Sequence, residues 1–419
     1  MKIYISGISG TGMGPLALMA KKAGIDVCGS DLKKGAIYDE LIEAGIEVKI
    51  GEQDGEFLCE KIEEGVEWFV YTSALPEDSI ELEYAESARL RISKRDNLTE
   101  FLVRKQKLKM VAVAGTHGKT TTTAMIIWAC LKLNLPVSYV VGSTLGFAPS
   151  GSYDLGDEYF IYEADEYDRN FLKFYPWLAV ITTVSYDHPD IYKTPEDYED
   201  AFETFRMQAE NVLDAYGEGP ATDQFTLAGE ARRQDAAFAL GAVLTIYTDL
   251  MDQGEASLPD FDEIVQILNE FPGVGRRFEK LSDGIYTDYA HHPEEIKATM
   301  EMALEQAEID KKKGVVVVYQ PHQNTRQHEV QDLYYDAFIG AHKVFWLPTY
   351  LTREDENLPI LLPMDFINTL DNAEVAEPAE LGDDLWKEIQ KYRDDNYLVI
   401  LMTAGPADGW LREKLADLH

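Results

Sequence analysis

The stretch VAVAGTHGKTTTT at residues 111–123 constrains the fold of this chain more than any other feature. Its apolar start predicts a strand, which runs into a turn containing Gly115 and Gly118, and Lys119 with four threonines then opens a helix. A strand, a glycine turn and a helix in this order present backbone N–H groups and the positive end of a helix dipole to an anion. The segment therefore predicts a nucleoside triphosphate site in a parallel α/β domain.

The match to the general phosphate-binding loop is imperfect, because the first glycine of G-x-x-x-x-G-K-[ST] would fall at Val113. We expect Lys119 to reach the terminal phosphates and the Thr120 hydroxyl to bind magnesium. The alternative is a tight structural turn beside a solvated lysine. The candidate nucleotide-binding residues of this segment are Gly115, Thr116, His117, Gly118, Lys119, Thr120 and Thr121.

Composition excludes several classes of function. The net charge of −37 argues against nucleic-acid binding, which requires a positive surface. No run of 18 apolar residues is present, so no membrane span is expected, and the first residues lack the apolar stretch of a secretory signal. The three cysteines have no metal-ligand spacing, which predicts free thiols in a reducing compartment and a cytoplasmic location.

Alternating strand and helix patterns divide the 419 residues into three parts, at 1–106, 107–280 and 281–419. The pattern of each part predicts a doubly wound, mainly parallel α/β sheet. Residues 195–212 have a helical pattern, and residues 214–224 that of a loop. The predicted strands include Lys2–Ser6, Ile25–Ser30, Trp68–Ser73, Tyr159–Glu163, Leu178–Val184, Gly284–Asp288, Val315–Tyr319 and Tyr397–Met402.

A second glycine turn follows the first strand, with glycines at positions 7, 10, 12 and 14. This spacing differs from G-x-G-x-x-G but predicts a diphosphate held at a helix N-terminus, with an acid after the second strand near a ribose. A purely structural turn is the alternative. The candidate ligand-binding residues here are Gly10, Thr11, Gly12, Met13 and Asp31.

Polar groups also follow two strands of the central part. Four carboxylates between Glu163 and Asp168 close an apolar strand, which is costly unless a cation is near. Magnesium prefers oxygen ligands and substrate phosphates, so Glu163 is a candidate ligand, with a solvated acidic loop as the alternative. His188 follows the next strand, at the sheet edge where ligands bind in open α/β sheets.

The last part carries further candidates for anion binding. Arg276 and Arg277 lie just before it, after a predicted helix, and arginine binds phosphate or carboxylate in a bidentate manner. Two successive strands end in polar segments, DYAHHP from Asp288 and QPHQNTR ending at Arg326. As metal sites these are poor, but as binding groups for an anionic substrate they are reasonable.

The segments GTHGKTTTT, EADEYDRNF, the DH dipeptide at 187–188, FPGVGRRFE, DYAHHPEEI and QPHQNTR together resemble the Mur ligases of the peptidoglycan pathway, especially their alanine-adding members. The resemblance implies a Rossmann-like domain for a UDP-sugar, a P-loop ATPase-like central domain and a Rossmann-like C-terminal domain for the amino acid. It implies that ATP phosphorylates the lactyl carboxylate of UDP-N-acetylmuramate and that L-alanine then attacks the acyl phosphate. A monomer or a homodimer is expected.

The resemblance also implies roles for individual residues. Lys119 would stabilise the transferring phosphoryl group, with Thr120, Glu163 and His188 as Mg²⁺ ligands. Arg276 and Asp288 would lie near the nucleotide. The residues near the substrates would be Arg277, His291, His322 and Arg326, of which His291 and Arg326 are assigned to catalysis.

The chain departs from the family pattern at three places. A His-Asn-x-x-Asn motif used near adenine is replaced in residues 229–237, where Asp235 stands for the second asparagine, and the strands expected before it are missing. Gln327 and His328 stand where a further arginine is common, and residues 405–408 differ from the usual glycine-rich turn. These departures leave base recognition open.

Three other functions remain as alternatives. A recycling ligase that attaches a whole tripeptide is consistent with Gly10–Gly14 and with Trp128. A non-catalytic nucleotide-binding protein is consistent with the altered segment at 229–237. An NAD-dependent oxidoreductase would use the first glycine turn, although its irregular spacing disfavours this function.

Overall fold

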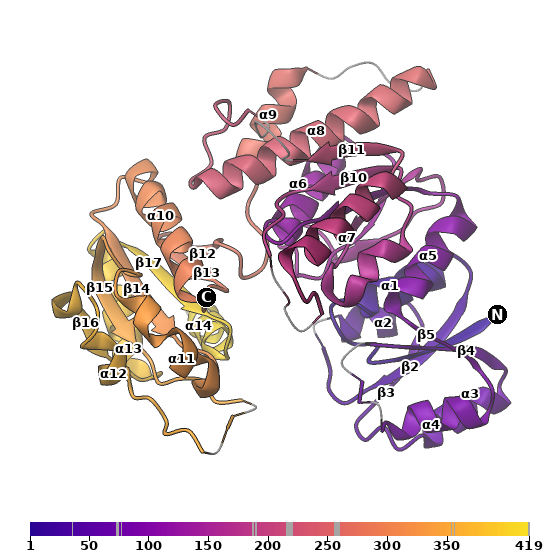
Figure 1. The fold of residues 1–419 in the computed structure, drawn as a ribbon, viewed down its shortest axis with the longest axis horizontal. Coiled ribbons are helices and arrows are strands. Elements are labelled where there is room, and N and C mark those ends of the chain that lie inside the picture. The colour runs from indigo at the N-terminus through magenta and orange to yellow at the C-terminus, as the bar shows by residue number, and fades with distance from the viewer. Residues whose placement is uncertain are drawn as a thin grey trace. The chain divides into compact units, whose positions relative to one another are not determined.

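The computed structural model describes residues 1–35, 37–72, 75–76, 78–186, 188, 191–214, 221–254, 260–352, 354–355 and 357–417. Three sheets built mainly of parallel strands form its frame (Figure 1). The chain divides into two compact units: residues 1–225 with 234–271, and residues 226–233 with 272–419. Each unit is described by itself.

The first sheet is fully parallel, in the order β3-β2-β1-β4-β5. The strand order reverses at β1, so the glycine turn after β1 lies at the switch point, where such sheets bind ligands. The strands are β1 (Lys2–Ser6), β2 (Asp26–Asp31), β3 (Glu47–Ile50), β4 (Val66–Tyr71) and β5 (Arg91–Lys94). The helices are α1 (Gly14–Lys22), α2 (Tyr38–Glu43), α3 (Glu56–Glu63), α4 (Ile80–Ser87) and α5 (Arg95–Gln106).

The second sheet has the order β11-β10-β6-β9-β7-β8, in which the β7–β8 pair is antiparallel. The phosphate-loop strand β6 lies between β10 and β9, so the loops that follow these three strands come together at one edge. The strands are β6 (Lys109–Ala114), β7 (Val137–Val140), β8 (Gly151–Ser152), β9 (Tyr159–Glu163), β10 (Leu178–Ile181) and β11 (Asn211–Asp214). The helices are α6 (Lys119–Lys132), η1 (Tyr167–Lys173), α7 (Pro195–Gln208), α8 (Glu230–Asp252) and α9 (Phe261–Asn269).

One apolar core joins the first two sheets, which explains why they form a single unit. Leu16 of α1, Leu98 of α5, Phe160 of β9 and Phe202 of α7 belong to the same buried cluster. Burial of apolar side chains contributes about 1.5–3 kcal/mol for each large residue. This shared core fixes the first glycine turn relative to the phosphate loop.

The second unit contains the third sheet, in the order β12-β13-β17-β14-β15-β16, parallel except for the β12–β13 pair. Helices α10 and α12 pack with η2 on one face, and α13 and α14 pack on the other. The strands are β12 (Glu279–Ser282), β13 (Ile285–Asp288), β14 (Val315–Gln320), β15 (Ala341–Trp346), β16 (Ala376–Pro378) and β17 (Leu398–Thr403). The helices are α10 (Pro293–Ile309), α11 (Asn324–Val330), η2 (Gln331–Tyr334), α12 (Pro363–Ile367), η3 (Ala373–Val375), α13 (Asp383–Asp394) and α14 (Ala407–Ala416).

The predicted fold class is confirmed, and some predicted boundaries are wrong. The predicted strand Trp68–Ser73 is β4, Val66–Tyr71, and Ser73 lies outside the described residues. Helix α7 ends at Gln208 because Ala209 turns to an extended conformation, and Asn211–Asp214 then pairs with β10 as an edge strand. A strand is therefore present in the stretch where none was expected. The predicted strand Leu178–Val184 ends earlier, at Ile181. Within the predicted loop at 214–224, residues 215–220 lie outside the described residues.

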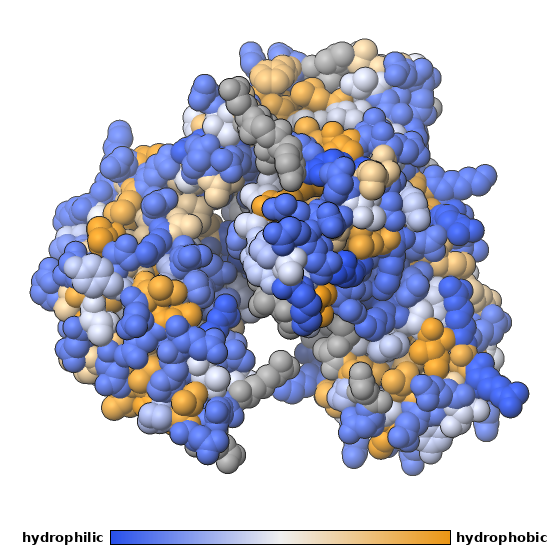
Figure 2. Space-filling model, in the orientation of Figure 1, coloured by the Kyte–Doolittle hydropathy of each residue, from blue (hydrophilic) through white to orange (hydrophobic). Residues whose placement is uncertain are grey.

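The surface reflects the acidic composition. Figure 2 shows a mostly hydrophilic face on which apolar side chains are scattered. Cys28 and Cys130 are buried free thiols, as predicted, and Cys59 is partly exposed. In the described part of the chain, no helix combines the length and apolar character that a membrane crossing needs.

A fully buried carboxylate holds the first sheet together beneath the glycine turn. Glu81 of α4 is 1% exposed and accepts hydrogen bonds from the hydroxyls of Tyr4, Ser6 and Ser30 at 2.6–2.7 Å. The side-chain amide of Gln53 donates to it at 3.0 Å. A buried charge is tolerated only when it is paired or hydrogen-bonded in this way.

Replacing this carboxylate is expected to destabilise the protein strongly. Glu81→Ala leaves several buried hydroxyls without an acceptor, so the free energy of unfolding of the first unit should fall by about 3 kcal/mol or more. Urea unfolding monitored by circular dichroism measures this change. Glu83→Ala on the exposed face of the same helix is the control, and equal effects of the two substitutions would contradict the role of Glu81.

Candidate active site

The loop between β6 and α6 depends on its two glycines. Gly115 and Gly118 have φ angles of +139° and +81°. A Cβ atom at Gly115 would lie 2.2 Å from Thr182 Oγ1, and one at Gly118 would lie 2.4 Å from Asp235 Oδ1. Side chains are therefore excluded from both positions, and the loop presents its backbone. Helix α6 then begins at Lys119 with no side-chain cap at Gly118, which leaves its first amides for an anion.

Two loop amides that were predicted to bind nucleotide have partners within the protein. The Thr116 N–H donates to the Thr183 carbonyl oxygen at 2.9 Å, and the His117 N–H donates to Thr183 Oγ1 at 3.0 Å. The Thr116 hydroxyl donates to the Ser185 carbonyl oxygen and lies 2.8 Å from the Tyr198 hydroxyl. These two residues shape the loop, and the phosphate contacts predicted for them stay predictions.

The Lys119 ammonium is folded back over the loop. It donates to the carbonyl oxygens of Gly115 at 2.6 Å and Thr116 at 3.3 Å, and to Glu166 Oε1 at 3.0 Å. Glu166 Oε2 lies 2.9 Å from the same nitrogen. The ammonium thus contacts the loop backbone and a carboxylate whose role the sequence did not single out, and its contact with phosphates stays a prediction.

Glu166 connects Lys119 to the next strand end. Its residue is 1% exposed, and its Oε1 lies 3.6 Å from His188 Nε2. Burial raises the pKa of Glu166, and the adjacent Lys119 ammonium opposes this rise. The Tyr192 hydroxyl donates to the Glu166 carbonyl oxygen at 2.6 Å, which fixes the backbone here. The sequence of the acidic segment after β9 could not tell which of its carboxylates faces Lys119.

Thr120 and Glu163 lie together, as the magnesium prediction requires. The Thr120 hydroxyl donates to Glu163 Oε1 at 2.8 Å, so a hydroxyl and a carboxylate oxygen converge beside the loop. Oxygen ligands of this kind suit Mg²⁺, which usually completes its shell with water and substrate phosphates. His188 contacts Glu166 rather than belonging to a dense ligand cluster, and no group of three or more His, Cys, Asp or Glu is found among the described residues. The residues present therefore fit a metal held jointly with phosphate.

The altered segment at 229–237 reaches this loop through one residue. Asp235 of α8 accepts a hydrogen bond from the Thr122 hydroxyl at 2.9 Å, and both side chains are buried. Asp235 also closes the space beside Gly118. Another residue of the altered segment, Arg233, belongs to the second unit and forms an ion pair with Glu305 there. Asp235 thus supports the phosphate loop, whereas its relation to a base stays a prediction.

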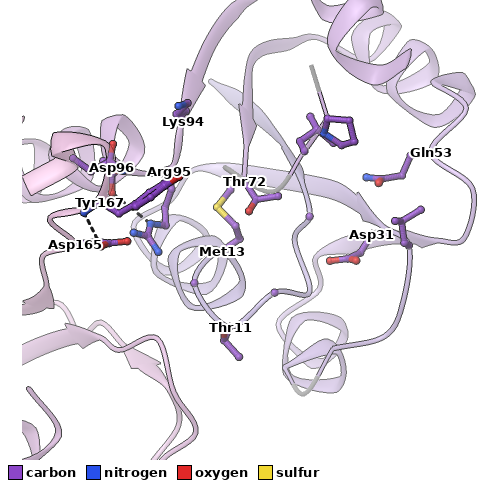
Figure 3. Close-up of a pocket in the computed structure, with 17 residues that line it drawn as sticks. Thr11, Met13, Asp31, Gln53, Thr72, Lys94, Arg95, Asp96, Asp165 and Tyr167 are labelled. Atoms are coloured by element: carbon purple, nitrogen blue, oxygen red, sulfur yellow. Dashed lines mark hydrogen bonds and ion pairs between the residues drawn. The ribbon is translucent and has the colours of Figure 1, made fainter. Parts of the chain in front are cut away.

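A pocket of about 450 Å³ opens beside the first glycine turn. All five residues predicted here line it, and the Asp31 carboxylate also accepts the Ser9 N–H at 2.8 Å, which holds the turn. Figure 3 shows Asp31 and Gln53 on one side of the pocket and Lys94, Arg95 and Tyr167 on the other. The pocket is lined by Gly7, Gly10, Thr11, Gly12, Met13, Asp31, Leu32, Gln53, Thr72, Leu75, Pro76, Lys94, Arg95, Asp96, Asp165, Tyr167 and Asn170.

The acidic segment at residues 163–168 contributes side chains to both the phosphate loop and the pocket of the first unit. Glu163 and Glu166 face the phosphate loop, whereas Asp165 and Tyr167 line the pocket. The rings of Tyr167 and His188 meet edge to face, with centroids 5.2 Å apart. The pocket and the phosphate loop are therefore neighbours joined by a few residues.

In the second unit the structure brings His291 and Arg326 together. Arg326 Nη1 lies 2.8 Å from His291 Nε2, and because a guanidinium only donates, Nε2 must accept. The imidazole is therefore neutral, with Nδ1–H donating to the Tyr289 carbonyl oxygen at 3.0 Å. Burial lowers the pKa of His291 below its usual 6.5, and the Arg326 charge also lowers it, while the Glu295 carboxylate 3.2 Å from Nδ1 partly opposes this change. The His322 ring lies 5.8 Å away between centroids.

The remaining predicted residues of this unit make mainly structural contacts. The Asp288 carboxylate is buried and accepts the N–H groups of Phe278 at 2.7 Å and Ala290 at 2.8 Å. Arg276 donates to the Thr403 carbonyl oxygen at 2.7 Å. Arg276 and Arg277 both lie over the Tyr289 ring, at 4.7 and 5.2 Å from its centroid. Contacts of Asp288 and Arg276 with nucleotide, and of Arg277 with substrate, stay predictions.

Comparison with known proteins gives the family. A family model described as Mur ligase family, catalytic domain, matches residues 2–107, and the Mur ligase middle domain model matches residues 113–213. A UDP-N-acetylmuramate–L-alanine ligase of Fusobacterium nucleatum subsp. nucleatum is 30% identical over an alignment of 478 positions including gaps, which covers 100% of this chain and 97% of the relative. The chain belongs to the Mur ligase family.

Other Mur ligases agree over most of the chain. A UDP-N-acetylmuramate–L-alanine ligase of Syntrophomonas wolfei is 31% identical, covering 84% of this chain and 83% of the relative. The solved UDP-N-acetylmuramate–alanine ligase of Thermotoga maritima superimposes with a TM-score of 0.75 at 22% identity, covering 100% of this chain and 99% of that one. A murein peptide ligase of Psychrobacter arcticus gives a TM-score of 0.59 at 22% identity, covering 100% and 98%. These structural likenesses establish the Mur ligase fold.

The His291–Arg326 contact predicts a pH dependence in this Mur ligase. Burial disfavours a protonated His291, and protonation would also place an N–H against the guanidinium. These two effects outweigh the opposing Glu295 carboxylate, so the pKa of His291 is lower in the folded chain than in the unfolded chain. The unfolded chain then binds more protons between these two pKa values, and stability rises with pH through that window, which lies below 6.5. Imidazole NMR titration together with urea unfolding from about pH 5 to 7 measures both quantities. A His291 titration above 6.5 would contradict the assignment.

Proposed function

We propose that this Mur ligase joins L-alanine to the lactyl carboxylate of UDP-N-acetylmuramate, with ATP hydrolysed to ADP and phosphate through an acyl phosphate. The observation that carries the proposal is the convergence of Lys119, Glu166, Thr120 and Glu163 on one glycine loop beside a pocket. Full-length relatives at about 30% identity that are named UDP-N-acetylmuramate–L-alanine ligases support the choice of substrates.

The phosphate loop would bind the ATP tail. The first amides of α6 and the Lys119 ammonium would stabilise the negative charge of the phosphoryl group as it leaves ADP. Thr120 and Glu163 would hold Mg²⁺, with His188 close to the same phosphates. When bound, the metal supplies charge neutralisation on the phosphate oxygens.

The pocket beside the first glycine turn would bind UDP-N-acetylmuramate. Its glycine-rich backbone at the start of α1, with Lys94 and Arg95 opposite, suits a diphosphate. The Tyr167–His188 contact links this pocket to the phosphate loop, so the lactyl carboxylate would meet the γ-phosphoryl group there. A carboxylate oxygen attacks phosphorus, the bond to ADP breaks, and an acyl phosphate forms.

The second unit would bind the amine substrate, L-alanine. The Arg326 guanidinium suits the carboxylate of an amino acid, and the neutral His291 imidazole is an acceptor beside it. The amine of L-alanine attacks the acyl carbon, phosphate leaves, and the nitrogen loses a proton to form the amide. We place this reaction in the cytoplasm.

Product analysis tests the proposed function. The purified protein is incubated with ATP, Mg²⁺, UDP-N-acetylmuramate and a mixture of L-amino acids and the tripeptide L-Ala-γ-D-Glu-diaminopimelate, and products are identified by mass spectrometry. UDP-N-acetylmuramoyl-L-alanine is the expected product. The tripeptide adduct alone would assign the protein to the recycling ligases, and ATP binding without any product would indicate a non-catalytic nucleotide-binding protein.

The loop lysine should be essential for turnover. Lys119→Ala removes the ammonium that acts on the developing charge, so kcat should fall by about 10³-fold or more while the fold is retained. Steady-state phosphate release measures kcat, and circular dichroism checks the fold. Lys132→Ala, at the exposed end of the same helix, is the matched control. Near wild-type turnover of Lys119→Ala would remove this lysine from the mechanism.

Arg326 should matter more for the amine than for ATP. Arg326→Ala is expected to raise KM for L-alanine by roughly tenfold or more and to leave KM for ATP within about twofold, because one charge-assisted contact is lost at one substrate only. Arg393→Ala, an arginine of α13 paired with Asp394, is the control. Equal increases in the two KM values would argue against the amino acid role.

A further inference from the structure

A buried chain of hydrogen bonds joins the two segments of the second unit that carry His291 and Arg326. The Tyr319 hydroxyl lies 3.2 Å from the His291 carbonyl oxygen and 2.6 Å from the Tyr334 hydroxyl. Tyr334 donates to Gln327 Oε1 at 2.7 Å, and Gln327 Nε2 donates to the His322 carbonyl oxygen at 2.9 Å. The side chains of Tyr319, Tyr334 and Gln327 are fully buried. The chain thus runs from one polar segment to the other through the core.

The number of phenol protons limits how many acceptors these hydrogen bonds can serve. Each phenol has one proton, and burial raises the pKa of both Tyr319 and Tyr334, so both stay neutral. Two protons serve three acceptors: the His291 carbonyl oxygen, the Tyr334 hydroxyl oxygen and Gln327 Oε1. The Tyr334 proton is donated to Gln327 Oε1. The Tyr319 proton is therefore shared between the Tyr334 oxygen at 2.6 Å and the His291 carbonyl oxygen at 3.2 Å, so the hydrogen bonds run from Tyr319 through Tyr334 to Gln327 and also reach His291.

Gln327 sets this direction. Its Nε2 is held by the His322 carbonyl oxygen, so Oε1 must face Tyr334 as an acceptor. A flipped amide would place Oε1 against the His322 carbonyl oxygen, so that two acceptors would face each other. Gln327 also follows Arg326 directly on α11, a helix of seven residues, so anchoring Gln327 fixes the side from which Arg326 approaches His291.

We propose that Gln327 is a positioning residue of the amino acid site, which holds the His322 segment directly and the His291 segment through Tyr334 and Tyr319. The spacing between the Arg326 guanidinium and the His291 imidazole depends on this anchor. The inference rests on the proposed function, because that function makes these two groups the binding site of the amine. The residue acts through its neighbours and touches no substrate.

Kinetics of matched variants test the role. Gln327→Met keeps the length and bulk of the side chain but removes both hydrogen bonds. It should raise KM for L-alanine by about tenfold and leave KM for ATP within about twofold, since a small displacement of positioning groups has large kinetic effects. Tyr334→Phe should act in the same direction, and the double variant should be less than additive because both belong to one chain. Equal changes in KM for ATP and L-alanine, or full additivity, would overturn the proposal.

Two variants at residues outside this set of hydrogen bonds serve as controls. Gln331→Met removes an amide that donates to the Asp365 carbonyl oxygen, and Tyr335→Phe removes a hydroxyl paired with Asp371 at the surface. Both should leave the two KM values unchanged. If they reproduce the effect of Gln327→Met, general loosening of this region explains it and the positioning role is wrong.

Nitrogen-15 NMR of the imidazoles gives a readout that does not need activity. In Gln327→Met the His291 and His322 signals should shift or show mixed tautomers, while His342, which stacks on Tyr397 elsewhere in this unit, should not change. Absence of L-alanine-dependent phosphate release in the wild-type protein would overturn the proposed function. Unchanged His291 and His322 signals would overturn the positioning role by itself.

Discussion

The pairing of the Lys119 ammonium with the loop carbonyls and with Glu166 is the interaction on which the first unit depends. A lysine needs several acceptors when its charge is partly removed from water, and here Gly115, Thr116 and Glu166 supply them. The same contacts hold the glycine loop closed around the start of α6 and tie the end of β9 to the end of β6. A bound triphosphate would compete with these acceptors for the ammonium. Lys119 could then exchange its contacts with Glu166 and the loop carbonyls for contacts with phosphate oxygens.

The three polar centres share one architectural origin. The pocket lies after β1, the phosphate loop after β6, and the His291–Arg326 pair after β13 and β14. In each case the carboxyl ends of parallel strands deliver polar groups to one sheet edge. The shared core of the first two sheets fixes the first two centres with respect to each other, and the Tyr167–His188 contact joins them.

Much of this arrangement could be predicted from sequence because strand ends are local signals. The strands Lys2–Ser6 and Tyr159–Glu163 and the glycine turns follow from apolar runs that end in glycine or acid. Partners set by tertiary packing could not be predicted. Nothing local in EADEYD shows that Glu166 faces Lys119 while Asp165 lines the pocket, and nothing in QPHQNTRQ shows that Gln327 reaches Tyr334 through the core. The edge strand β11 was missed because four polar and apolar residues next to a helix carry too weak a pattern.

The central claim is that this loop transfers a phosphoryl group from ATP to a carboxylate of the sugar nucleotide. Isotope transfer tests it directly. UDP-N-acetylmuramate labelled with oxygen-18 in the lactyl carboxylate is turned over with ATP and L-alanine, and the released phosphate is examined by mass spectrometry or phosphorus NMR. The account predicts one carboxylate oxygen in each phosphate molecule formed. Phosphate that contains oxygen from solvent and none from the carboxylate would contradict it.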